Sequence, residues 1–75
     1  MKHIIQVYIS KGENYYIAEG VDLPIVTQGK TLDELVVNVK EALELYLEGE
    51  DLSDLNIAPN PSVLMNFELS TRLHA

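Results

Sequence analysis

The side chains best suited to acid, base or nucleophilic chemistry are scattered along this chain. His3 and His74 stand at opposite ends of the sequence, and neither has a second histidine or a carboxylate at the spacing of a metal or general-base site. The serines lack the G-x-S-x-G context that exposes an activated hydroxyl. The four glycines form no phosphate-binding pattern, and there is no cysteine for a thiolate or redox centre. We therefore expect no enzyme activity, no bound metal and no cofactor.

Acidic residues are the one chemical type that is concentrated. Eight of the twelve acids lie between Asp33 and Asp54. Three of them are three and four residues apart, a spacing that suggests a cation site on one helix face, but no other ligands converge there. One interpretation is a surface that steers a basic partner, and the other is a solvated face that keeps the protein in solution. The acidic ridge is defined as the six acids that have no Lys or Arg among them: Glu41, Glu44, Glu48, Glu50, Asp51 and Asp54.

The overall charge excludes one class of partner. The net charge is −7, and the five Lys and Arg residues are scattered without forming a stripe. Such a chain repels phosphate backbones, so direct binding of nucleic acid is not expected. The sequence also has no long apolar run and no basic segment typical of a signal peptide, which predicts a soluble, cytoplasmic protein without membrane contact.

One helix is strongly indicated. Thr31 followed three residues later by Glu34 matches a capping box, so the helix is expected to begin at Leu32. It is expected to end near Glu48, where Gly49 can adopt the left-handed conformation of a helix terminus. The opposite, solvated face carries Asp33, Lys40, Glu41, Glu44 and Glu48. The apolar residues, spaced to line one buried face, are Leu32, Leu35, Val36, Val39, Leu43, Tyr46 and Leu47.

Three strands are predicted before the helix. Residues 3–10 alternate, with Ile5, Val7 and Ile9 on one face. Turn residues 11–14 then lead into a second strand over 15–19, which forms an antiparallel hairpin with the first. Gly20 and Pro24 bracket another turn, a short third strand follows over 25–28, and Gly29 leads into the helix cap.

The segment after the helix predicts a loop and one more strand. Residues 50–62 are rich in acids, Asn and Pro, which favours a loop with one helical turn near 53–55. Residues 62–69 alternate again and are expected to form the fourth strand, and 71–75 a frayed tail. The order β-β-β-α-β predicts a single α+β domain over 1–75, with two layers: one helix packed on a small mixed sheet.

A domain of this size is expected to associate with itself. A chain of about 60 residues buries only about 60% of its unfolded surface, so small domains are marginally stable alone. One helix covers one sheet face, while Ile4, Tyr8 and Leu64 lie on the other. We therefore expect a homodimer or higher oligomer that covers these residues.

The segment from Asp22 to Glu48 resembles the HicB antitoxin family. The similar residues are D-L-P at 22–24, T-Q-G at 27–29, Thr31 and Glu34, then Asn38 and E-A-L-E-L-Y-L-E at 41–48; residues 16–19 resemble the family's second strand. The structural positions of this motif are Pro24, Gly29, Thr31, Glu34 and, just after it, Gly49. The family commonly has Gly where Ile25 follows Pro24 here.

The resemblance implies a trimmed ribonuclease H-like fold and a protein that neutralises a toxin. HicB-like proteins bind small basic RNA-cleaving HicA-like toxins and mask their active site. The negative charge of the acidic ridge would be complementary to such a basic toxin. Two alternatives are an orphan HicB-like oligomeric domain that binds another protein, and a metal-dependent hydrolase. Against the latter, the middle of the first strand, 5–8, has no acid, and the fourth strand offers only Glu68. Many members carry a C-terminal operator-binding module, whereas this chain ends shortly after the predicted fourth strand. No operator binding is therefore expected from this chain alone.

Overall fold

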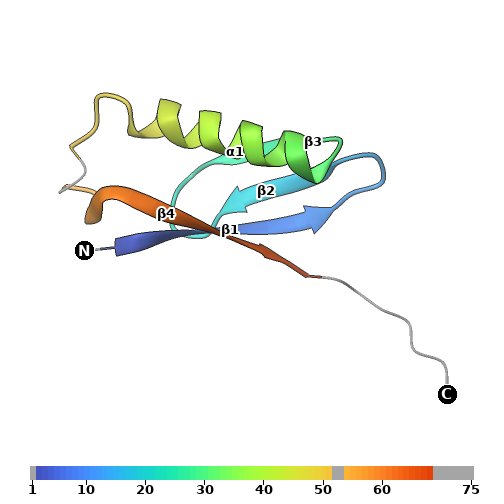
Figure 1. Ribbon diagram of the computed structural model, residues 1–75, viewed down its shortest axis with the longest axis horizontal. Helices are drawn as coiled ribbons and strands as arrows, with labels where there is room; N and C mark the ends of the chain where they lie inside the picture. Colours follow the sequence, from blue (N-terminus) through green and yellow to red (C-terminus); the bar gives the residue numbers. More distant parts are fainter. Residues whose placement is uncertain (1, 52–53, 69–75) are drawn as a thin grey trace, which may run out of the picture.

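The computed structural model describes residues 2–51 and 54–68, and it confirms the expected order of elements. Three strands, β1 (Lys2–Lys11), β2 (Tyr16–Gly20) and β3 (Val26–Gly29), precede the helix α1 (Leu32–Leu47), and β4 (Ile57–Phe67) follows it. Figure 1 shows α1 lying across one side of the strands. The fold is therefore α+β, with one helix packed on a four-stranded sheet.

The sheet is mixed and has the strand order β3-β2-β1-β4. β1 pairs antiparallel with β2, and β2 pairs antiparallel with β3. β4 returns on the other side of β1 and pairs with it in parallel, with Ile5 opposite Val63 and Ile9 opposite Phe67. The parallel pair requires a long crossover, which α1 supplies. β3 and β4 are consequently the two edges of the sheet.

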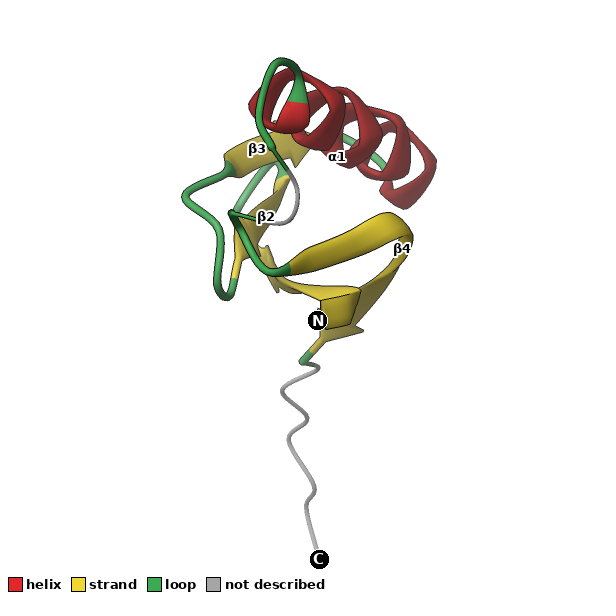
Figure 2. Ribbon diagram, turned by 90° about the vertical axis from the view of Figure 1, so that its left-hand side faces the viewer, coloured by secondary structure: helices red, strands yellow, loops and turns green. Residues whose placement is uncertain are grey.

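The core lies between α1 and the inner face of the sheet. Alternation along β1 turns Ile5, Val7 and Ile9 inward, as predicted, and each is less than 5% exposed. From the helix, Leu35, Val39 and Leu43 are buried against the same cluster. Figure 2 views this layer arrangement along the strands, with the helix over β3 and β2. Further buried core residues are Ala18, Ile25 and Ile57.

Helix α1 begins and ends as the sequence predicts. The Thr31 hydroxyl accepts the backbone N–H of Glu34 at 3.1 Å, which satisfies one of the free amides of the first turn. The Leu47 terminus lies one residue before the expected end. Gly49 has a φ of 75°, the left-handed conformation in which residues with a side chain are strained.

The turn before β3 is built on Pro24. The Ile25 N–H donates to the Leu23 carbonyl at 2.8 Å, which closes a three-residue turn centred on the proline. The Gly20 N–H in turn donates to the Ile25 carbonyl at 2.9 Å. Ile25 is only 7% exposed and joins the core, so a large side chain is accommodated after this proline.

The prediction for residues 57–61 was wrong. They were expected to lie in a loop, yet β4 already begins at Ile57, which is 1% exposed. Pairing passes from Lys2 opposite Ile57 to Ile4 opposite Ser62, so β4 carries three extra residues at this irregularity. Asn60 has a φ of 52° there, and the neighbouring prolines are tolerated because an edge strand needs no N–H on its open side.

Two helix residues also depart from prediction. Leu32 and Val36 were expected in the buried stripe, but they are 48% and 37% exposed. Both departures follow from the position of α1, which packs on β3 and β2 and leaves its other flank uncovered. A turn is present at residues 54–56, near the expected helical turn. The expected tail, 71–75, and Leu69 lie outside the described residues.

Gly29 and Gly49 predict two different costs of adding a methyl group. A Cβ on Gly29 would lie 2.7 Å from the Leu35 nitrogen and 2.9 Å from its Cα, so the backbone of α1 would have to move. A Cβ on Gly49 would meet nothing within 4 Å and suffers only from its positive φ. We expect Gly29→Ala to lower the free energy of unfolding by about 3 kcal/mol or more and Gly49→Ala by about 1 kcal/mol, measured by urea denaturation. Equal losses would contradict the close contact of β3 with α1.

Candidate partner-binding surfaces

The structure places all six residues of the acidic ridge on the surface. Glu41, Glu44 and Glu48 line one shallow hollow of about 280 Å³ on the exposed side of α1, together with Leu45. The expected solvated face of the helix is thus confirmed, since Asp33 and Lys40 are exposed as well. Three carboxylates consequently share one local surface.

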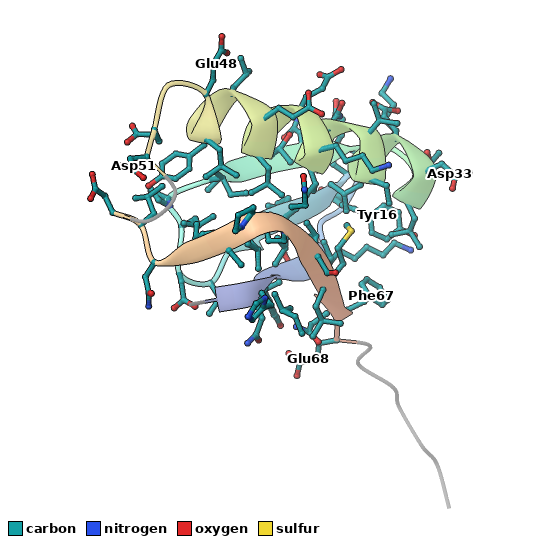
Figure 3. All side chains as sticks on the ribbon, turned by 60° about the vertical axis from the view of Figure 1, so that its left-hand side comes forward. Tyr16, Asp33, Glu48, Asp51, Phe67 and Glu68 are labelled. Carbon is teal, nitrogen blue, oxygen red and sulfur yellow. The ribbon has the colours of Figure 1, made fainter. Side chains whose placement is uncertain are left out.

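The rest of the ridge continues around the end of the helix. The Asp51 carbonyl accepts the N–H of Asp54 at 3.0 Å and that of Leu55 at 3.3 Å, which forms a turn that keeps the two aspartates close in space. Figure 3 shows Glu48 pointing away from the sheet and Asp51 beyond the last turn of the helix. The ridge therefore covers the C-terminal end of α1 from more than one side.

These acids lie where the helix itself does not favour them. The C-terminal end of a helix carries partial negative charge, and a carboxylate there costs about 0.3–1 kcal/mol when exposed. The last turn of α1 has no basic residue, whereas Asp33 and Glu34 occupy the favourable first turn. Glu41, Glu44 and Glu48 also repel one another at their three- and four-residue spacings. Glu44 and Glu48 are thus placed unfavourably with respect to the helix dipole, although Lys40, four residues before Glu44, offsets part of this cost.

Leu45 is a surface feature that the sequence reading missed. Its side chain is 72% exposed and sits among the ridge acids on α1. The sequence could have indicated this, because Leu45 lies outside the apolar stripe of the helix, on the side that is otherwise charged. An exposed leucine ringed by charge has the layout of a small docking site, with an apolar centre and a polar rim.

The outer sheet face carries the residues predicted for self-association. Ile4, Tyr8 and Leu64 are 52%, 37% and 48% exposed. In register, however, Leu64 lies opposite Gln6, and Tyr8 lies opposite Glu19. Because cross-strand partners share a face, polar side chains interrupt the apolar ones on this surface.

The end of β4 is held on both faces. On the outer face the Tyr8 hydroxyl donates a hydrogen bond to the Glu68 carboxylate. On the inner face the rings of Tyr16 and Phe67 meet edge to face, with centroids 6.0 Å apart. Figure 3 shows Glu68 next to the end of β4 and turned away from the helix. These contacts fix the last residues of the strand next to β1 and β2.

A groove lies between α1 and β4 on the inner face. Its volume is about 660 Å³, and its floor includes Ile5 and Met65. Lys40 and Glu44 stand on the helix side, and Pro61 and Val63 on the strand side. The lining is mainly apolar, so the inner face of the sheet is incompletely covered by its own helix.

The remaining chemistry-bearing residues do not form a site. His3 is exposed at the start of β1, Ser10 and Ser62 lie in strands, and His74 lies outside the described residues. Within residues 2–51 and 54–68, no three His, Asp or Glu side chains are grouped so that they could hold a metal ion. In the same part of the chain, no helix combines the length and apolar character needed to cross a bilayer.

Asn38, a residue of the HicB-like motif, has a structural contact. Its side-chain amide donates to the Gln28 carbonyl at 2.7 Å and so ties α1 to the edge of β3. Thr31, Glu34 and Gly29 likewise serve the cap and the close packing described above. These four motif residues therefore serve the architecture, whereas Glu41, Glu44, Leu45 and Glu48 of the same motif are exposed.

A relative carries a closely similar segment. A "UPF0150 protein" from Archaeoglobus fulgidus is 52% identical to this chain over 44 residues, which cover 56% of this chain and 64% of the relative. The match therefore spans less than two thirds of that protein. No family model and no solved structure matches the chain. The HicB-like interpretation consequently stays a prediction.

The Tyr8 contact predicts a stability loss at high pH. The hydrogen bond to the Glu68 carboxylate, then desolvation and the negative charges of Glu68 and Glu19, raise the pKa of Tyr8 above its usual value of 10.0. A raised folded pKa means that the stabilisation is complete below about pH 10 and is lost as pH rises through the folded pKa. We expect Tyr8→Phe to be less stable than the wild type at pH 8 and to approach it above pH 10, in urea denaturation at each pH.

A neutral acceptor provides the control for this contact. Glu68→Gln keeps an oxygen for the Tyr8 hydroxyl but removes the charge, so the pKa of Tyr8, followed by NMR, should fall toward its usual value. A stability difference between wild type and Tyr8→Phe that is constant with pH would contradict the assignment.

Proposed function

We propose that this chain is an antitoxin-like protein-binding domain that neutralises a small, basic, HicA-like RNA-cleaving toxin by masking its active site. The observation that carries the proposal is the surface at the end of α1, where Glu41, Glu44 and Glu48 surround the exposed Leu45. The HicB-like motif supplies the identity of the partner, and the ridge supplies a docking surface of matching sign.

The electrostatics of the ridge support binding rather than folding as its purpose. Six acids around one helix end create a negative potential that accelerates encounter with a basic protein. Glu44 and Glu48 oppose the helix dipole, so the dipole does not account for acids at this end of α1. A solvated surface would serve equally well with acids placed in the first turn.

Leu45 supplies the part of the interface that charge alone lacks. Exposed ion pairs contribute little net affinity, because they remain solvated and are screened by salt. Affinity usually resides in a few side chains that become fully buried at the centre of an interface. We assign Leu45 this role and the ridge the role of orienting the partner around it.

The open edge of β4 favours one alternative function. The chain would then be an orphan HicB-like domain that forms oligomers and binds another protein, with no toxin. A neighbouring reading frame that encodes a small basic protein with one histidine in a strand favours the antitoxin. Cleavage of RNA by the present chain alone, in magnesium or manganese, would overturn both in favour of a hydrolase.

The charge of the ridge predicts the affinity for such a toxin. The combined change Glu44→Lys, Glu48→Lys and Asp51→Lys should weaken the complex by at least about tenfold and flatten its dependence on salt. The fold should persist, because two small effects on helix stability oppose each other. Lysines near the C-terminal end of α1 are favoured by the helix dipole, whereas Glu44→Lys places a like charge near Lys40; each effect is less than about 1 kcal/mol. Calorimetry at two salt concentrations, with circular dichroism of each protein, measures both.

A triple variant with the same change in net charge serves as the control. Glu13, Glu19 and Asp33 are exposed acids outside the ridge, and their replacement by lysine should leave toxin affinity within about threefold. If both triple variants bind as the wild type does, or if both lose affinity equally, the ridge is not the docking surface.

Leu45 predicts a separate loss. Leu45→Ala should leave the free energy of unfolding within about 0.5 kcal/mol, because the side chain is 72% exposed in the free protein. It should weaken toxin binding by 1 kcal/mol or more, roughly fivefold. RNA cleavage should then return in a mixture of toxin and variant in about equal amounts. Full inhibition by Leu45→Ala would show that the partner binds elsewhere.

A further inference from the structure

The two edges of the sheet differ in a way that the elements themselves explain. β3 has four residues, and at its edge the Gln28 carbonyl is occupied by the Asn38 side chain of α1. β4 has eleven residues, and among the described residues no strand pairs with its outer side. A strand in this position presents a row of unpaired N–H and C=O groups. The β4 edge is therefore the open one.

The side chains along this edge are apolar on the inner face, and on the outer face Leu64 lies between the polar Ser62 and Asn66. On the inner face Val63 and Phe67 are 39% and 42% exposed, and on the outer face Leu64 is 48% exposed. The irregularity ahead of them contains Pro59 and Pro61, which have no N–H to offer, so regular pairing is restricted to residues 62–67. This segment matches the length and composition of a strand that accepts another strand.

Charge decides what can pair with the segment. The chain carries a net charge of −7, so two copies repel each other over most of their surfaces. Residues 62–67, S-V-L-M-N-F, contain no charged side chain. On the outer face, by contrast, Glu19 and Glu68 flank Tyr8, and a face-to-face dimer would bring these acids together. A basic partner gains nothing at a neutral edge and is drawn to the acidic ridge, whereas a second copy of the chain meets no charged side chain within residues 62–67.

We propose that residues 62–67 of β4 pair antiparallel with the same segment of a second copy, with Leu64 opposite Leu64 at the two-fold axis, giving a symmetric dimer with one continuous eight-stranded sheet. An antiparallel edge contact is self-complementary, as an isologous interface must be. Both α1 helices then lie on the same side of the sheet. The inner-face side chains of each copy extend the apolar wall of the groove that Val36 and Met65 line in the other.

This dimer leaves the acidic ridge accessible. Glu41, Leu45 and Glu48 line only the hollow on α1, whereas Glu44 lines both the hollow and the groove next to β4. The surface proposed for a basic partner and the surface for a second copy therefore meet at Glu44 but do not otherwise coincide. The inference thus assigns self-association to the edge of β4 in place of the outer face. It does not require that a toxin exist.

Introducing a charge of either sign at Leu64 tests the proposal. Sedimentation equilibrium should show a dimer for the wild type, and Leu64→Lys and Leu64→Glu should each weaken dimerisation by at least about tenfold, because like charges meet across the two-fold axis. An equal mixture of the two variants should dimerise again, because opposite charges now face each other. A misfolded variant would not be restored by mixing.

Two further variants distinguish pairing at the β4 edge from association through the outer face. Ile4→Lys places the same charge on the outer face at a similar exposure, 52%, and should leave the dimer intact. Because the chain has no cysteine, Leu64→Cys introduces a single thiol that should form an intermolecular disulfide under mild oxidation. A monomeric wild type, a dimer that survives both Leu64 charges, or a dimer lost with Ile4→Lys but not with Leu64→Lys would overturn the proposal.

Discussion

The structure depends on one helix having to cover a four-stranded sheet. Leu35, Val39 and Leu43 pack against the inward residues of β1 and β2, and this contact forms most of the core among the described residues. A helix is about 10 Å wide, whereas the outer strands of four are about 14 Å apart, and α1 sits over the β3 and β2 side. The groove beside β4 and the exposure of Val36 follow from this mismatch of widths, and the open edge follows from the place of β4 at the end of the strand order.

Charge then divides what the helix leaves uncovered. The acids collect toward the C-terminal end of α1, and Leu45 is a large, exposed apolar side chain beside Glu41, Glu44 and Glu48. Residues 62–67 at the far side of the sheet are neutral. A small acidic domain thus presents two surfaces of different character, an acidic one that we propose for a basic protein and a neutral one that we propose for a second copy.

The sequence predicted the elements better than their arrangement. Alternation located β1, and the Thr31 cap located α1, because these signals are local and each is repeated by several residues. The start of β4 was missed since Pro59, Asn60 and Pro61 are typical of loops, and only pairing with β1 makes them part of a strand. The exposed Val36 and the free edge depend on strand order and helix position, which no short segment encodes. The six acids were located correctly on the surface, but the place of Leu45 among them required the structure.

The most direct test of the two-surface account is an NMR titration of the isotope-labelled chain with the proposed partner, a small basic HicA-like protein from a neighbouring reading frame. The account predicts that the amide signals of residues 41–51 shift or broaden, while those of 62–67 remain unchanged. Shifts centred on β4 with an undisturbed ridge would contradict it, as would the absence of any change at concentrations where the neighbouring protein cleaves RNA.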